Sequence, residues 1–477
     1  MSPVASNTKK SIAWVVVLAG IGSFMAALDT LVVSTALPTI RRDLGASISG
    51  LEWTVNAYNL SFAVMLITAA ALGDRFGRRR LYAIGLVAFA AASAASALSP
   101  SVGWLIFARV LQGVGAAFIL SLGLALLSAA FPPERRGLAI GLFSAVTGLA
   151  VASGPLVGGA VVNGLDWTWI FWLNVPIGLI AAPLVLSRMR ESFGPDTALD
   201  FRGLGLVSAG AFGIVWGLVR GNSVGWGSLE VIGALVVGGL FLTAFVAWEL
   251  RAPEPMIPMS FFRSRAFAAG NTAIFFVLAS LFAEVYFFSQ LLQTAMGFDA
   301  LGAGLRLIPW TGTFLIVGPI AGALTDRIGE RPLMVGGLLI QAGAAVWIAL
   351  IASTDLAYSQ LVIPMVVGGI GISMALPSAQ NSVLGSVSDE SVGKAAGTNS
   401  VMRELGGVFG IAVAVAVFAG AGGYASPQEF IDGFGPAIGG VAAGLALLGA
   451  IAGSALPRHS EAADLIGVAP AVPAEAN

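Results

Sequence analysis

The chain contains no cysteine and one histidine, His459, among its 477 residues. The absence of cysteine excludes disulfide bonds, thiolate metal sites and thiol catalysis. Because His459 lies in a polar C-terminal tail, a histidine metal site or a Ser-His triad among the apolar segments is excluded too. We therefore expect no metal, no cofactor and no enzymatic activity.

Charged residues are scarce as well, at 10% of the chain, whereas soluble globular proteins carry about 25%. Hydrophobic residues make up 57%, and the mean hydropathy is +0.90. A soluble chain could not bury so much apolar surface, but a bilayer removes that need. The net charge of -1 offers no basic surface for nucleic acid. The composition predicts an integral membrane protein.

Fourteen apolar runs are candidates to cross the hydrocarbon core, which takes about 20 residues per helix. They do not show the alternation of a membrane β-barrel, so the expected fold class is an all-α polytopic membrane protein. The first run is too long for a cleaved signal peptide. Twelve or thirteen spans would leave 203–219 or 229–248 on the surface, but neither has the polar face of an interfacial helix. The runs cover 12–37, 51–72, 81–98, 103–130, 136–162, 168–187, 203–219, 229–248, 266–292, 300–324, 332–352, 358–385, 395–420 and 434–456.

The distribution of Lys and Arg predicts that both termini are cytoplasmic, because cytoplasmic loops carry an excess of these residues. With that orientation only Arg41, Arg42, Arg220 and Arg306 fall outside. Eighteen fall inside: Lys9, Lys10, Arg75, Arg78, Arg79, Arg80, Arg135, Arg136, Arg188, Arg190, Arg202, Arg251, Arg263, Arg265, Arg327, Arg331, Lys394 and Arg458.

An internal repeat follows the second and tenth runs. Both copies have the order L-x-D-R-x-G-x-R, and they lie in loops predicted to be cytoplasmic. Such loops are rich in arginine anyway, but that explains the charge and not the shared order. The copies read Leu72-Gly73-Asp74-Arg75-Phe76-Gly77-Arg78-Arg79 and Leu324-Thr325-Asp326-Arg327-Ile328-Gly329-Glu330-Arg331.

This loop resembles the signature loop of the major facilitator superfamily. Fourteen spans, two of them between the halves, resemble its 14-span drug:proton antiporter family, which includes quaternary-ammonium and multidrug exporters. Three further segments resemble the family's motifs in spans one, four and five. They are Leu28-Asp29-Thr30 with Ala36-Leu37-Pro38-Thr39-Ile40, Arg109-Val110-Leu111-Gln112-Gly113-Val114-Gly115, and Gly148 with Gly154-Pro155-Leu156-Val157-Gly158-Gly159.

The resemblance implies a major facilitator fold with two six-helix halves and two extra linker helices. It makes Asp74, Arg75, Gly77, Arg78, Arg79, Asp326, Arg327 and Gly329 a loop that controls conformation. The resemblance also implies an antiporter helix motif that acts as a hinge or as a seal against leak. The alternative is that these residues only permit tight helix packing. The motif consists of Gly148, Gly154, Pro155, Gly158 and Gly159. The expected parts are a cytoplasmic N-terminal segment (1–10), the N-terminal half (11–190), the linker (191–262), the C-terminal half (263–456) and a disordered cytoplasmic tail (457–477).

No ATP-binding sequence G-x-x-x-x-G-K-[ST] is present, so energy must come from a gradient or a partner. A carboxylate within the membrane is costly and marks a functional site by default. Asp29 and Glu284 lie at comparable depth in spans one and nine, and Arg109 in span four reaches a similar level. We expect these three groups to meet in one cavity and couple proton movement to transport. The alternative for each carboxylate is a permanent brace to an arginine.

Two further groups of polar and aromatic residues are candidates. Arg403 and Glu404 in span thirteen are adjacent and need not pair, so a gate contact and a structural bridge are equally compatible with them. A substrate cavity could be lined by Trp53, Asn56, Tyr58, Asn59, Gln112, Phe275, Phe276, Tyr286, Gln290 and Gln293, although aromatic residues more often face lipid or the interface.

The sequence therefore predicts a proton-coupled exporter of amphipathic, cationic or lipophilic drugs that works by alternating access. The alternative is a lipid exporter or a dedicated metabolite or antibiotic self-resistance exporter of the same fold. A membrane-embedded enzyme and a non-transporting receptor fit less well. The expected partners are an amphipathic small molecule, protons and membrane lipids, with no nucleic acid, and the expected protein is a monomer in the bacterial inner membrane.

Overall fold

The computed structural model describes residues 3–131, 146, 149–150, 153–154, 156–193, 200–253, 255, 257–387 and 392–457. Every regular element in this part of the chain is helical, so the expected all-α class is confirmed. Long apolar segments form helices in a bilayer because a helix satisfies its own backbone hydrogen bonds.

The helices of the N-terminal half follow the predicted runs closely. The first helix starts before the predicted span and includes the polar lead with Lys9 and Lys10. It also continues past the predicted end through Pro38, as helices in membranes tolerate. The elements are α1 (Pro3–Leu44), α2 (Ile48–Phe76), α3 (Arg78–Ala97), α4 (Val102–Ala130), α6 (Trp169–Trp172) and α7 (Asn174–Arg188).

Two linker helices precede the C-terminal half. They are α8 (Phe201–Val224) and α9 (Leu229–Glu249). The following elements are η2 (Met259–Arg263), α10 (Arg265–Gln290), η3 (Leu291–Ala295), α11 (Ala300–Arg306), α12 (Ile308–Ile328), α13 (Glu330–Ile351), α14 (Tyr358–Leu384), α15 (Val392–Ala421), α16 (Pro427–Gly435), η5 (Pro436–Ala442) and α17 (Ala443–Ser454). Three predicted spans are broken: 168–187 into α6 and α7, 300–324 into α11 and α12, and 434–456 by the π-helical turn η5.

Twelve helices of the described residues are long and apolar enough to cross a membrane, and the number is thirteen if bent α2 counts as one span. The bend in α2 is 47° and separates Ile48–Leu66 from Thr68–Phe76. The fifth predicted span, 136–162, lies largely outside the described residues, so fourteen spans stays a prediction. The chain is a multi-pass membrane protein.

The sequence repeat is also a structural repeat. In each copy a glycine with positive φ separates two consecutive helices: Gly77 (φ 106°) between α2 and α3, and Gly329 (φ 82°) between α12 and α13. In each copy the glycine N–H donates to the carbonyl four residues earlier, on Gly73 or Thr325. Glycine occupies this backbone region without a Cβ clash, so the repeat preserves a turn geometry.

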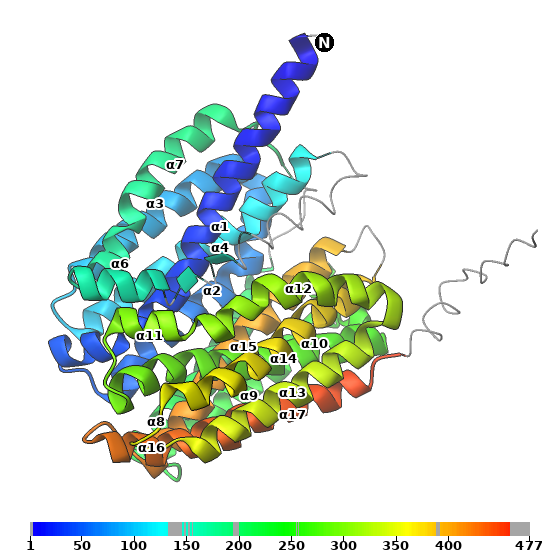
Figure 1. Ribbon diagram of the computed structural model, residues 1–477. Coiled ribbons are helices and arrows are strands. Elements are labelled where there is room, and N and C mark those ends of the chain that lie inside the picture. The colour runs from blue at the N-terminus through cyan, green and yellow to red at the C-terminus, as the bar shows by residue number, and fades with distance from the viewer. Residues whose placement is uncertain are drawn as a thin grey trace, which may run out of the picture.

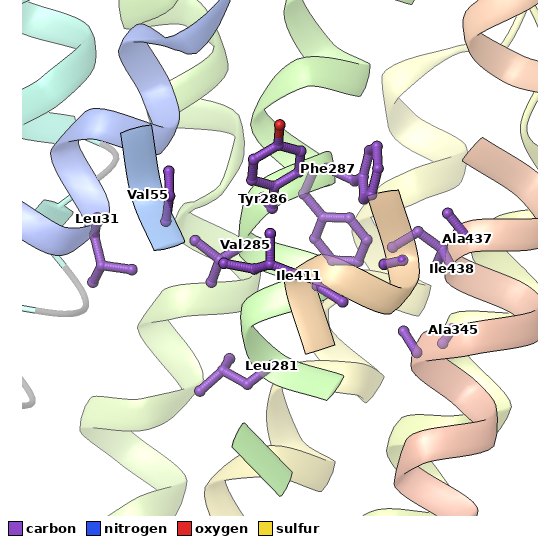
Figure 2. Close-up of a cluster of buried hydrophobic side chains, with 14 of the residues drawn as sticks. Leu31, Val55, Leu281, Val285, Tyr286, Phe287, Ala345, Ile411, Ala437 and Ile438 are labelled. Atoms are coloured by element: carbon purple, nitrogen blue, oxygen red, sulfur yellow. The ribbon is translucent and has the colours of Figure 1, made fainter. Parts of the chain in front are cut away.

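The halves share an apolar core at one end of the molecule. Leu31 and Val55 of α1 and α2 belong to the same buried cluster as Leu281 and Val285 of α10 (Figure 2). A separate cluster, with Tyr82 and Phe89 of α3, fills the N-terminal half. In Figure 1 the first turns of α1 project away from the C-terminal half.

The hairpin of α8 and α9 lies over the seam where α2 of one half meets α15 of the other. Ala211 and Val215 of α8 share a buried cluster with Leu60 of α2 and with Val408 and Ala412 of α15. The linker therefore covers both halves at once, although its sequence position suggested only an insertion between them.

Candidate transport site

Asp29 of α1 lies at the centre of a buried polar cluster in the N-terminal half. The Nη1 atom of Arg109 on α4 donates to Asp29 Oδ2 and forms an ion pair with it. Gln112 Nε2 and Asn174 Nδ2 donate to the other oxygen, Oδ1, at 2.8 and 2.9 Å. Gln112 also donates to Ser93 Oγ at 2.8 Å. Three helices, α1, α4 and α7, therefore meet at one carboxylate, and Gln112 connects α3 to it.

The Arg109 side chain is fully enclosed, with 0% exposure. Its Nε donates to the Thr54 carbonyl at 3.0 Å, and its guanidinium lies 4.2 Å from the ring centroid of Tyr58. The Tyr58 hydroxyl in turn donates to the Ala26 carbonyl at 3.0 Å. A buried arginine requires a counter-charge and filled hydrogen bonds, and Asp29 provides the charge here.

Glu284 of α10 occupies a different buried site, in the C-terminal half. Gln341 Nε2 on α13 donates to Glu284 Oε1 at 3.3 Å and to Ser280 Oγ at 2.8 Å. Ser280 Oγ donates to the carbonyl of Ala442, the last residue of the π-helical turn η5, at 2.8 Å. Glu284 Oε2 has no hydrogen-bond partner, and the residue is 2% exposed. No cation among the described residues pairs with this carboxyl group.

The structure therefore brings together two of the three ionisable groups that were expected to converge. Asp29 and Arg109 form an ion pair, an arrangement that agrees both with a coupling site and with the permanent brace that was its alternative. Glu284 contacts neither of them and is held by an amide. The reason is geometric, because equal depth along a span does not fix which side of its helix a residue faces.

The halves meet at the end of the molecule that carries the turn of residues 45–47, which we call the closed end. Gln293 Nε2 of η3 donates to the Thr35 carbonyl of α1 at 2.9 Å, across the boundary between the halves. The Arg41 guanidinium of α1 lies 4.5 Å from the ring centroid of Tyr424, which precedes α16. On the predicted topology this end faces the outside.

Three glycines of the predicted antiporter motif lie at tight helix contacts. A Cβ atom on Gly154 would be 2.6 Å from Leu31 Cβ, and one on Gly158 would be 3.1 Å from the Val32 carbonyl oxygen. A Cβ on Gly159 would be 2.3 Å from the carbonyl oxygen of Ala300, at the start of α11 in the other half. Gly148 and Pro155 lie outside the described residues. These glycines permit close backbone approach within a half and between the halves.

The first copy of the loop motif is tied to the end of α7. Arg78 Nε donates to Asp74 Oδ1 at 2.7 Å, and the backbone N–H of Arg79 donates to Glu191 Oε1 at 2.8 Å. Arg79 Nη1 donates to the Met189 carbonyl at 3.2 Å. Arg75 packs over the Phe76 ring instead, 5.7 Å from its centroid.

The second copy of the loop motif cannot form the same pair, because Glu330 replaces the arginine that is Arg78 in the first copy. Its Arg331 reaches the Leu456 carbonyl at 3.5 Å. Asp326 and Arg327 lie in the last turn of α12, before Gly329. The two copies therefore share a turn, but the pair between Asp74 and Arg78 has no counterpart in the second copy.

The predicted cavity residues do not line one common cavity but lie in several parts of the structure. Tyr58 and Gln112 belong to the Asp29 cluster, and Asn56, Tyr286, Gln290 and Gln293 lie toward the closed end. Asn59 is buried with both amide atoms unpartnered. Trp53 packs on Phe212 and Trp216 of α8, whereas Phe275 and Phe276 pack on α15 and α17. Arg403 and Glu404 are half-buried on α15, with no ion pair between them.

Sequence reasoning missed four polar partners: Glu52, Asn174, Glu191 and Gln341. Glu52 could have been found, because it is the one carboxylic acid in the predicted run 51–72. Its position near the start of that run suggested a solvated end, but the residue is 1% exposed. Asn174 and Gln341 are neutral and carry no comparable signal in hydropathy.

Comparison with known proteins identifies the family. The sequence model of the Major Facilitator Superfamily matches residues 19–411. The chain is 34% identical over 430 residues to the tetracenomycin C resistance and export protein of Streptomyces glaucescens, covering 89% of this chain and 80% of that protein. It is 31% identical over 402 residues to the multidrug transporter protein MdtP of Bacillus subtilis, covering 83% of this chain and 73% of that protein.

A third relative, the puromycin resistance protein pur8 of Streptomyces alboniger, is 32% identical over 478 residues and covers 97% of this chain and 94% of its own. Among solved structures, a D-xylose–proton symporter superposes with a TM-score of 0.66 at 16% identity, covering 94% of this chain and 98% of its own. That likeness concerns the fold alone. The family model and these relatives show that the chain belongs to the Major Facilitator Superfamily, and the helical architecture and the repeated loop agree with this.

Proposed function

We propose that this protein exports amphipathic, cationic or lipophilic drugs from the cytoplasm in exchange for protons, by alternating access between its two halves. It works as a monomer in the bacterial plasma membrane, in contact with lipid and with both termini in the cytoplasm. The observation that carries the proposal is the pair of buried carboxyl sites, Asp29 in one half and Glu284 in the other. Two relatives are named as a resistance and export protein and as a multidrug transporter, and these names support export as the direction of transport and drugs as the substrate class.

Glu284 is the carboxyl group best placed to accept a proton. It lies in a low-dielectric site with one amide donor, a free oxygen and no cation, so proton binding removes an otherwise costly charge. Asp29 contributes differently, because its charge is held by Arg109 and two amide groups. Arg109 must release Asp29 before a proton or a cationic substrate can replace it, so this pair links helix movement to binding.

The test is transport of ethidium into proteoliposomes, with and without an imposed proton gradient. We expect gradient-driven movement with the natural protein and its loss with Glu284→Gln, which keeps the shape but cannot exchange a proton. Asp355→Asn is the matched control, since Asp355 is an exposed acid in the turn between α13 and α14. Gradient-driven transport at the natural rate by Glu284→Gln would remove Glu284 from the coupling mechanism.

A dedicated self-resistance exporter is the second candidate, and the names of two relatives favour it specifically. These relatives are a tetracenomycin C resistance and export protein and a puromycin resistance protein. A thermal-shift screen in detergent distinguishes the candidates, because a ligand that binds the folded protein raises its Tm. Stabilisation by one antibiotic class alone supports self-resistance, whereas stabilisation by unrelated lipophilic cations supports multidrug export.

A further inference from the structure

Glu52 is a buried carboxylic acid that the exchange mechanism above does not use. It lies in the first turns of α2, at the closed end, and is 1% exposed. Asn56 and Asn59 follow at spacings of four and seven residues, so the three side chains share one face of the helix. All three are buried, and together they form a polar row on α2.

This row faces the other half of the protein. Glu52 lies within electrostatic range of the hydroxyl groups of Tyr286 on α10 and Tyr424 before α16. Val55, on the adjoining part of α2, belongs to the apolar cluster that also contains Tyr286 (Figure 2). Glu52 is therefore enclosed by the contact between the halves, not by the core of one half.

The site does not satisfy a carboxylate. Among the described residues, the hydrogen bond to Glu52 comes from Asn56 Nδ2, which donates to Oε1 at a long 3.4 Å. Asn56 Oδ1 and both amide atoms of Asn59 are buried without partners. The Tyr424 hydroxyl donates to Gln290 Oε1. Burial raises the pKa of the Tyr424 hydroxyl above its usual range, so this residue stays neutral.

The neighbouring charges are engaged elsewhere or lie further along their helices. Asp29 and Arg109 pair with each other, Arg220 pairs with Glu230, and Arg41 covers the Tyr424 ring. None of the ion pairs among the described residues includes Glu52. Among the residues whose side chains the structure describes, the charged and titratable groups on α2 and on the elements packed against it are Asp29, Arg41, Arg42 and Asp43 (α1), Tyr58, Asp74 and Arg75 (α2), Arg78, Arg79, Arg80 and Tyr82 (α3), Arg109 (α4), Arg202 and Arg220 (α8), Arg265, Glu284 and Tyr286 (α10), and Arg403 and Glu404 (α15).

We propose that Glu52 is a second proton-binding site, which holds a proton while the closed end is shut and releases it when the halves separate there. A buried carboxylate that pairs with no cation is energetically costly, and a proton removes that cost. When the halves part, water reaches Glu52 and stabilises the ionised form. High pH on this side therefore favours separation, and low pH favours closure. This inference rests on the proposed proton exchange but concerns the conformational step, not the carboxyl group that drives transport.

The natural absence of cysteine makes a direct test available, since two introduced cysteines are the only thiols. Arg42→Cys on α1 and Gln428→Cys on α16 place spin labels on exposed positions at the two sides of the closed end. Label distances are measured in lipid nanodiscs from pH 5 to pH 9 without substrate. We expect the short-distance population to dominate at low pH and a longer one to appear as pH rises.

Glu52→Gln mimics the protonated side chain, so we expect it to keep the short distance across the whole pH range. Glu52→Asp retains a titratable group and should keep the pH response, which covers the case in which the glutamine variant does not fold. Asp355→Asn, an exposed acid at the same end, should behave as the natural protein. A pH-independent distance in the natural protein, or an unchanged response in Glu52→Gln, overturns the proposal. Because no substrate is present, failed ethidium transport does not affect this readout.

Discussion

At the scale of the residue, Asp29 shows how one carboxylate can connect three helices. Its two oxygens accept from Arg109, Gln112 and Asn174, which come from two further helices and lie 80, 83 and 145 residues away in sequence. Glu284 has one amide donor and a free oxygen instead. The two acids are thus equally buried but differently satisfied, and their roles should differ accordingly.

Asp29→Asn should destabilise the protein strongly. The change leaves Arg109, which is fully buried, without a counter-charge, and breaking a buried pair on one side costs about 3–5 kcal/mol. We expect a large fall in Tm in detergent. The double variant Asp29→Asn with Arg109→Gln should recover part of the loss, because it removes the orphaned charge. A single variant as stable as the natural protein would contradict the brace.

At the scale of the element, a glycine with positive φ forms the turn in each copy of the loop motif. Gly77 has φ 106°, and a Cβ atom there would lie 2.9 Å from the carboxyl carbon of Glu191. A side chain at position 77 is therefore disfavoured for two reasons: the positive φ angle of the backbone and the close approach of Glu191, which follows α7. Gly329 shares the backbone constraint, with φ 82°.

Gly77→Ala should lower stability by at least about 1–2 kcal/mol, the cost of a left-handed backbone for a residue with a Cβ. Gly329→Ala should show the backbone part of this loss. The control is Gly103→Ala in the first turn of α4, where nothing lies within 4 Å of the added atom. Alanine should be neutral or stabilising at that helical position. Equal Tm values for the three variants would show that the turn tolerates a side chain.

At the scale of the whole molecule, one group of contacts between the halves lies at the closed end. There the bond from Gln293 to Thr35, the Arg41–Tyr424 contact and the approach of Gly159 to Ala300 all cross the boundary. The linker hairpin spans the same boundary at the side, over α2 and α15. Separation of the halves at this end therefore requires several small contacts to break together.

Gly159→Val should open the closed end. Its side chain would overlap the Ala300 carbonyl group, whose oxygen lies 2.3 Å from the Cβ position. With spin labels at Arg42→Cys and Gln428→Cys, we expect a longer distance at neutral pH. Gly164→Val, in the same helical segment, meets nothing within 4 Å and serves as the control. An unchanged distance in the Gly159 variant would show that this contact does not hold the halves together.

Much of the architecture could be predicted because it depends on local properties of the chain. Apolar runs of sufficient length must form helices in a bilayer, and the order around Gly77 and Gly329 specifies the same turn twice. Membership of the superfamily followed from the same motifs. Local sequence could not show that α1 extends from Pro3 to Leu44, because helix ends depend on caps and neighbours more than on hydropathy.

The sequence by itself determined that this is a helical membrane transporter with two related halves, since hydropathy and turn chemistry act over a few residues. Tertiary structure decided which polar groups meet. Asp29 pairs with Arg109, whereas Glu284 accepts a hydrogen bond from Gln341. Trp53 packs on the linker helix α8, and Glu52 is buried between the halves. These outcomes depend on the rotation of each helix about its axis, which is set by packing against helices distant in sequence.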